Sequence, residues 1–161
     1  MLTNPRYQMQ EIGLTELVGK DEQVDQNDYS GSVAITLGDG VRPVSGEFLA
    51  FAFYATEENA GAVQDSAGTL LLLDADPAVS SGDTALTAAE WKTVLGRVDV
   101  EAGDWITDAN GGLAYIFANP IPFHNLQTIY AVWLHTDATG LNDGGTDDEV
   151  LEFNAWYRRD T

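Results

Sequence analysis

Few side chains in this sequence have the type and spacing that nucleophilic catalysis needs. The chain has two histidines, His124 and His135, no G-x-S-x-G turn and no phosphate-binding loop ending in G-K-[ST]. It has no cysteine, which excludes a thiolate nucleophile, a thiolate metal site and a disulfide framework. His135 stands two residues before Asp137, where a carboxylate could orient a general base. We expect His135 to be a surface or edge residue with satisfied hydrogen bonds, and we expect no enzyme.

Carboxylates are so numerous that a pair resembling a glycosidase site would arise by chance. Hard oxygen ligands for calcium stand beside glycines in three segments. These segments are Asp74 with Asp76, Asp104 and Asp108 with Asn110, and the loop 137–149, which is densest from Asn142 to Glu149. None of them matches the spacing D-x-[DN]-x-[DN]-G-x₅-E of a calcium-binding loop. We therefore expect solvated acidic loops, no bound metal and no cofactor.

Tryptophan and arginine offer two further kinds of binding chemistry. Of the four tryptophans, Trp105 is the best candidate for an exposed sugar-stacking ring, although core packing is the expected role. The only adjacent basic pair is Arg158-Arg159. Two guanidinium groups can clamp the carboxylates of a partner or those of the chain's own acidic loops. The sequence leaves both of these possibilities open.

The charge of the whole chain restricts its partners. There are 26 acidic and 7 basic residues, which gives a net charge of −19 and a pI near 4.1. Such a chain is repelled by phosphate backbones and by anionic lipids, so we expect no nucleic acid and no membrane partner. The sequence has no apolar stretch of about 20 residues, and residues 1–30 lack the apolar core of a signal peptide. We expect no secretion signal.

Alternating and continuous apolar runs predict β-strands through most of the chain. The predicted strands are 32–37, 47–55, 69–74, 97–100, 112–119, 128–136 and 149–158. In 47–55, strict alternation places Phe51 and Phe53 on one face and Phe48 on the other. Because both faces are largely apolar, we expect this strand to be covered on both sides. Pro120 and Pro122 are expected to end the strand 112–119.

One short helix is predicted over residues 88–95. Thr87 and Glu90 have the spacing of a capping box, and Leu86 with Trp91 forms a hydrophobic staple. Gly96 stands where a left-handed residue commonly ends a helix. We expect Trp91 and the residues near Leu95 to pack this helix against the strands.

These elements predict a mainly β fold, an antiparallel β-sandwich, with a jelly roll as one possible form. The short helix and an extended N-terminal arm complete it. We assign residues 1–30 to the arm and residues 31–161 to a single sandwich domain. The arm is polar with scattered apolar anchors, and it could lie on its own domain, lie on a neighbour or be a loose terminus.

The stretch from Gly68 onward resembles a family of viral structural proteins. The segments that carry the likeness are GTLLLLDADP, TALTAAEWKTVLGRVDV, DW-x-x-DANG-x-x-AY and DDEVLEFNAWYRRD. They are similar to the head decoration, or cement, proteins of tailed bacteriophages. This resemblance implies a β-rich subunit, often trimeric, that clamps neighbouring copies of the major capsid protein on the outer surface of the virion. It also implies an N-terminal arm that reaches across subunits, but it identifies no binding residue.

Two non-enzymatic functions follow from these observations. The first is a capsid decoration or stabilising subunit that binds neighbouring capsid proteins and self-associates, with a trimer favoured. The residues assigned to partner binding are Tyr7, Ile12, Leu14, Leu17, Val18, Arg158 and Arg159. The second is a carbohydrate-binding β-sandwich in which Trp105 and an acidic calcium-binding loop hold the sugar.

Overall fold

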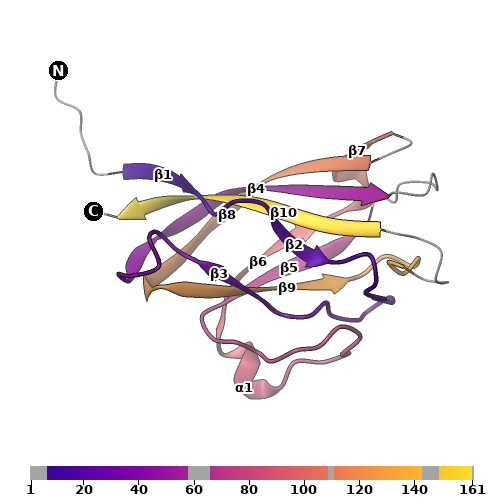
Figure 1. Ribbon diagram of the computed structural model, residues 1–161, viewed down its shortest axis with the longest axis horizontal. Coiled ribbons are helices and arrows are strands. Elements are labelled where there is room, and N and C mark those ends of the chain that lie inside the picture. The colour runs from indigo at the N-terminus through magenta and orange to yellow at the C-terminus, as the bar shows by residue number, and fades with distance from the viewer. Residues whose placement is uncertain (1–6, 58–65, 109–110, 143–148, 161) are drawn as a thin grey trace.

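The computed structural model describes residues 7–57, 66–108, 111–142 and 149–160. Two antiparallel sheets face each other in a sandwich (Figure 1), which confirms the predicted fold class. The strand order does not establish the jelly-roll form. No helix among these residues is long and apolar enough to cross a membrane.

The large sheet has the order β1-β10-β4-β8-β7, and β2 also pairs with β10. Its strands are β1 (Tyr7–Glu11), β2 (Thr15–Val18), β4 (Val44–Glu57), β7 (Trp105–Thr107), β8 (Gly111–Leu126) and β10 (Glu149–Asp160). The small sheet has the order β3-β9-β5-β6. Its strands are β3 (Val33–Thr36), β5 (Gly68–Leu73), β6 (Val94–Val100) and β9 (Thr128–His135). The helices are the single turn α1 (Ala88–Trp91) and the 3₁₀ turn η1 (Ala102–Asp104).

The main core lies between the two sheets and is rich in aromatic rings. Phe53 of the large sheet contacts Trp133 of the small sheet with ring centroids 5.7 Å apart, and both side chains are fully buried. Alternate residues of β9 share one face, and Ile129, Ala131 and Trp133 all enter this core. Val132, on the opposite face of β9, belongs to a second cluster beneath the loop that carries α1.

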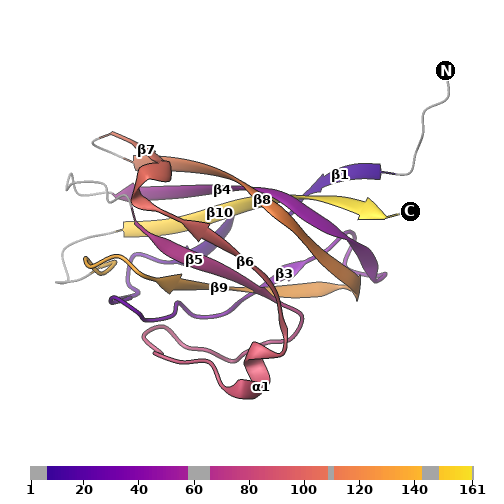
Figure 2. The same ribbon diagram turned by 180° about the vertical axis from the view of Figure 1, so that it is seen from behind.

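The alternation predicted for β4 is wrong at its first half. The register between β4 and β8 shifts between Phe48 and Ala50, so a β-bulge turns Phe48 onto the same face as Phe51 and Phe53. The prediction that β4 is covered on both sides also fails. Figures 1 and 2 show no described segment over the outer face of the large sheet, whereas the α1 loop covers the outer face of the small sheet.

The helix begins as predicted and ends early. The Thr87–Glu90 capping box is present, but α1 stops at Trp91, whose side chain is 50% exposed, and Val94 starts β6. Pairing with β5 incorporates residues 94–100 into the sheet, and a two-turn helix is too marginal to compete. Gly96 lies within β6, where a Cβ atom would come within 2.7 Å of Ile121. This glycine therefore permits close sheet packing and does not end a helix.

Strand β8 extends beyond its predicted limit. β8 continues through Pro120 and Pro122 to Leu126. β7 ends its pairing with β8 at Ala114, so one edge of β8 has no strand partner at the prolines within the described chain. A proline on a free edge costs no ladder hydrogen bond, which explains why these two residues do not end the strand.

The described part of the predicted arm begins with two strands that lie on the sandwich itself. β1 pairs with the last part of β10, from Tyr7 opposite Asp160 to Glu11 opposite Trp156. β2 pairs with the first part of β10. β1 and β2 are therefore strands of the large sheet, and they reach it by pairing with a strand that lies far away in the sequence. Of the alternatives for the arm, this matches the one in which it lies on its own domain.

Candidate interaction surface

The outer face of the large sheet carries a continuous group of apolar side chains. Directly paired residues on neighbouring strands share a face of the sheet. The register places Trp156, Ala50 and Phe117 in one row. Ala52 with Tyr115 forms the next row, and Tyr54, Leu113 and Ile106 form the third. These eight residues of β4, β7, β8 and β10 are called the aromatic face below. On β10 the second and third rows continue with Asn154, paired with Ala52, and Glu152, paired with Tyr54.

Three side chains on the aromatic face are highly exposed for their size. Phe117 is 86% exposed, Ile106 is 78% exposed and Tyr115 is 57% exposed. Two small residues of β4, Ala50 and Ala52, lie next to these rings, and Ala52 is completely buried by its neighbours. Phe117, Ile106 and Tyr115 therefore project beyond the small alanine side chains and are accessible to a partner.

Polar groups border the aromatic face on the side of β1 and β10. Tyr54 shares a hydrogen bond with Tyr115, and its pKa is raised, first by burial and then by the neighbouring tyrosine and Glu11. The side-chain amide of Asn154 donates a hydrogen bond to Glu11. None of the eight residues that form the face is charged. This is notable in a chain with 26 carboxylates, and it leaves an uncharged centre with an acidic border.

The structure separates the residues that the sequence assigned to partner binding. Leu17 is 2% exposed and Val18 is fully buried, so these two side chains stabilise the chain's own core. Ile12 packs against the same core, whereas Leu14 is 61% exposed. Tyr7 lies in β1 opposite Asp160. A partner-binding role stays a prediction for this group, and for Leu17 and Val18 it would require local opening of the sheet.

The two C-terminal arginines have partners within the chain. Arg158 forms an ion pair with Glu47 of β4. Asp39 has a lowered pKa, because the backbone N–H groups of Val41 and Arg42 donate to its carboxylate, and because the charges of Arg42 and Arg159 lie nearby. The intramolecular alternative for the basic pair therefore has direct support.

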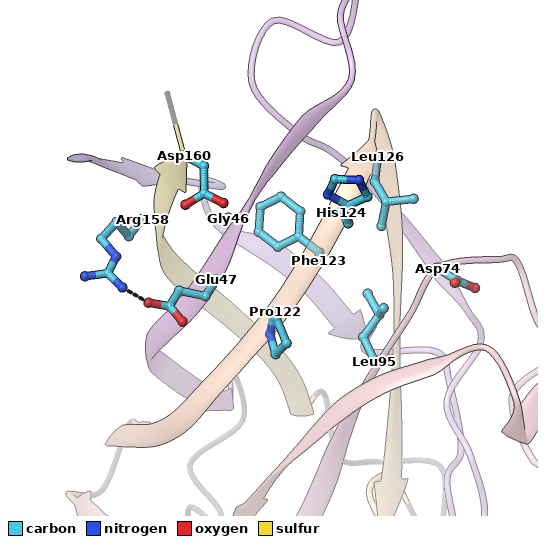
Figure 3. Close-up of a pocket in the computed structure, with 10 residues that line it drawn as sticks. All are labelled: Gly46, Glu47, Asp74, Leu95, Pro122, Phe123, His124, Leu126, Arg158 and Asp160. Carbon is cyan, nitrogen blue, oxygen red and sulfur yellow. Dashed lines mark hydrogen bonds and ion pairs between the residues drawn. The ribbon is translucent and has the colours of Figure 1, made fainter. Parts of the chain in front are cut away.

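A cleft of about 580 Å³ lies beside the ion pair between Arg158 and Glu47 (Figure 3). Its lining residues are Gly46, Glu47, Asp74, Leu95, Pro122, Phe123, His124, Leu126, Arg158 and Asp160. At its border the Ser45 hydroxyl lies 3.1 Å from His124 Nδ1 and accepts a hydrogen bond from the Asn125 backbone N–H. Within the described chain no carboxylate hydrogen-bonds the other nitrogen of His124. The pair therefore lacks the orienting group that an activated serine requires.

The other histidine and the candidate stacking tryptophan are both structural. His135 is fully buried, with Nε2 2.7 Å from the Thr139 carbonyl oxygen and Nδ1 3.4 Å from the Trp133 indole nitrogen. Both ring nitrogens are used, so the expectation of satisfied hydrogen bonds is correct, although the ring is buried. Trp105 is 8% exposed and donates to the Ser66 carbonyl. Its expected role in the core is confirmed.

The acidic segments use their carboxylates to hold turns. Asp76 accepts from the Ala78 backbone N–H, and Asp104 accepts from the Glu101 backbone N–H. Asp108 accepts in the same way from Gly111. Across the described ranges no group of three or more metal-ligating side chains comes together. Asn110 and the segment 143–148 lie outside the described residues.

Sequence reasoning did not identify the aromatic face, although a signal for it was present. The runs 48–55 and 113–117 are apolar at successive positions, so whichever face enters the core, the other face is also apolar. For residues 47–55 this pattern predicts a strand that is covered on both sides. The same pattern is also typical of a sheet with one apolar face open to a partner.

Comparisons with known proteins do not assign this chain to a family. No family model matches it, and no curated protein matches it. Among solved structures, the chain is similar to FlhE, with a TM-score of 0.39 and 13% sequence identity; the match covers 97% of this chain and 99% of the other. It is also similar to a chain of sacbrood virus of honeybee, with a TM-score of 0.35 and 9% identity; that match covers 100% of this chain and 74% of the other. A third similar structure is a chain of Israeli acute paralysis virus, with a TM-score of 0.31 and 11% identity; the match covers 94% of this chain and 72% of the other. Likeness at this level establishes neither a family nor a function.

Proposed function

We propose that this protein is a non-enzymatic structural subunit of a virion that decorates or stabilises the outside of a capsid. In this role it binds neighbouring copies of the capsid protein and self-associates. The observation that supports the proposal is the aromatic face, an exposed and uncharged surface on an otherwise acidic sandwich.

The composition of this face is that of a protein–protein contact. The buried centres of protein interfaces are depleted in charged residues and enriched in aromatic ones. Exposed apolar patches of several hundred Å² are uncommon on monomeric proteins and mark interaction sites. Phe117 and Ile106 are both more than three-quarters exposed and lie on the same outer face of the sheet.

The strands that carry the face also suit an assembly role. β4, β8 and β10 have 14, 16 and 12 residues and form the middle of the large sheet. A surface on long, mutually paired strands is already ordered before binding, so little conformational entropy is lost when a partner docks. Ser45–His124 and His135, the two candidate catalytic groups, lack an activating arrangement and leave enzyme function without support.

The residue on which the carbohydrate-binding alternative mainly depends is not available to stack on a sugar. Trp105, the ring proposed to stack on a sugar, is 8% exposed and hydrogen-bonded inside the sandwich. Asp104 and Asp108, proposed as calcium ligands, hold local turns. No observation on the described residues favours this function over assembly.

Co-sedimentation with capsids tests the proposed function. The purified chain is mixed with expanded and unexpanded heads of the phage that encodes it, and bound protein is measured against concentration. Saturable binding to expanded heads alone is the expected result. An exposed residue of the arm, Leu14, is replaced with aspartate to test its predicted contact, and Val41→Asp serves as a control of similar exposure in a turn. Absence of binding to both kinds of head would refute the proposal.

A further inference from the structure

We infer that the aromatic face binds the same face of a second copy of this chain, in a contact with two-fold symmetry. This inference deepens the proposed function and rests on it for its biological setting. The contact itself is a property of the isolated protein and can be tested without a capsid.

The charge of the chain indicates which partner fits this face. A basic partner would be drawn to the acidic surface, which covers much of a molecule with a net charge of −19. A second copy carries the same charge and is repelled by that surface. It can approach closely only where carboxylates are few, and the aromatic face has none among its eight residues, with Glu152 at its border beside Tyr54. An uncharged centre is thus the place where two copies of this acidic chain can meet.

The area of the face is sufficient for a specific contact. A large aromatic side chain contributes about 150–250 Å² when it is fully buried. At 86%, 78% and 57% exposure, Phe117, Ile106 and Tyr115 together present roughly 400 Å². The partly exposed Tyr54, Leu113 and Trp156 raise the area to at most about 600 Å² per copy, or about 1,200 Å² in total. This value lies at the lower end of the range for specific protein interfaces.

The arrangement of the rows suits an isologous contact, in which the same residues meet across a two-fold axis. Phe117 and Ile106 lie on the β7–β8 side of the face, whereas Glu11 and Glu152 lie at β1 and β10. A contact centred near β8 therefore keeps Glu11 and Glu152 of one copy apart from those of the other. Such a contact yields a dimer, in place of the trimer that the sequence resemblance favours.

Sedimentation velocity of the full chain over a range of concentrations tests this inference. We expect a reversible dimer whose affinity increases when salt is raised from about 20 mM to 500 mM, because salt screens the repulsion between two acidic molecules. Phe117→Glu is expected to weaken self-association at least tenfold, and Phe117→Ser is expected to weaken it less. Val41→Glu adds the same charge at a position that is 73% exposed outside the face, and it should leave the dimer unchanged.

Three results would overturn the inference. They are a monomer at every concentration and salt, equal weakening by Phe117→Glu and Val41→Glu, or a trimer that depends on Phe117. Circular dichroism of each variant confirms that the sandwich is folded. A salt-strengthened dimer that does not bind capsids would support this contact and contradict the proposed function. Capsid binding by a monomeric chain that requires Phe117 would assign the face to the capsid protein and refute the contact.

Discussion

Replacement of Asn142 with alanine is expected to destabilise the protein by about 3–5 kcal/mol. Asn142 is 7% exposed and joins three separate segments. Its side-chain amide nitrogen lies 3.0 Å from the Gly19 carbonyl oxygen, 2.9 Å from that of Glu22 and 3.1 Å from that of Glu149. Its side-chain oxygen accepts from the Glu149 backbone N–H at 2.8 Å. One residue thus connects the chain after β2 to the start of β10.

The expected loss has two parts. The alanine variant leaves buried carbonyl and N–H groups of the connected segments without their partner, which costs about 2–4 kcal/mol in total. Asn142 also has a φ of 56°, a left-handed conformation that costs alanine about 1 kcal/mol. Glycine removes the second part only, so Asn142→Gly should be about 1 kcal/mol less destabilising than alanine. Asn142→Asp should be at least as harmful as alanine, because it places a carboxylate against three carbonyl oxygens.

Urea unfolding followed by tryptophan fluorescence measures these differences, since Trp133 is completely buried in the core. Asn27 provides a matched control, because it has a φ of 69° and an exposed side chain. Asn27→Ala should cost about 1 kcal/mol, the conformational part alone. Equal free-energy losses for Asn27→Ala and Asn142→Ala would refute the argument that the buried hydrogen bonds of Asn142 stabilise the fold.

Two further predictions concern a close contact in the core and an exposed carboxylate. Gly68→Ala would place Cβ 2.2 Å from a ring atom of Trp133, so we expect thermal unfolding to show a loss of about 2–4 kcal/mol in the free energy of unfolding. Gly103→Ala is the control, because its Cβ would have no atom within 4 Å, and it should change the free energy of unfolding by less than about 0.5 kcal/mol. Two backbone N–H groups stabilise the ionised form of Asp39 and so lower its pKa in the folded protein. The ionised carboxylate therefore stabilises the fold at pH values above the ordinary carboxyl pKa. This contribution is lost as the pH falls through the lowered pKa of Asp39. The unfolding curves of Asp39→Ala and wild type should therefore differ at pH 7 and converge in acid, and a difference independent of pH would contradict this reasoning.

Local patterns in the sequence were enough to locate three strands of the small sheet. β3, β5 and β9 form close to their predicted limits, because their apolar residues alternate or run continuously and turn residues bound them. The capping box at Thr87 is also local, and the structure contains it. The end of α1 could not be predicted in this way. It depends on pairing of Val94 with Leu73, which local propensity does not report.

Strands that form through distant partners were missed for the same reason. β1 is polar and short, and its position is fixed by β10 and by a hydrogen bond from the Tyr157 hydroxyl to Gln10. A further bond joins the Gly38 backbone N–H to the same hydroxyl. These contacts link positions more than 100 residues apart, so no window of sequence around β1 contains the signal. The bulge that turns Phe48 into the core is likewise set by the register with β8.

The aromatic face shows where a correct reading of the pattern led to the wrong structural conclusion. A strand with two apolar faces is expected to have two apolar neighbours, but among the described residues a cover lies over the outer face of the small sheet alone. The α1 loop contributes Val79 and Leu86 to the outer side of the small sheet, and no described segment does the same for the large sheet. The proposed contact with a second copy would supply the missing neighbour. Phe117, at 86% exposure, is the residue whose replacement most directly tests which molecule that is.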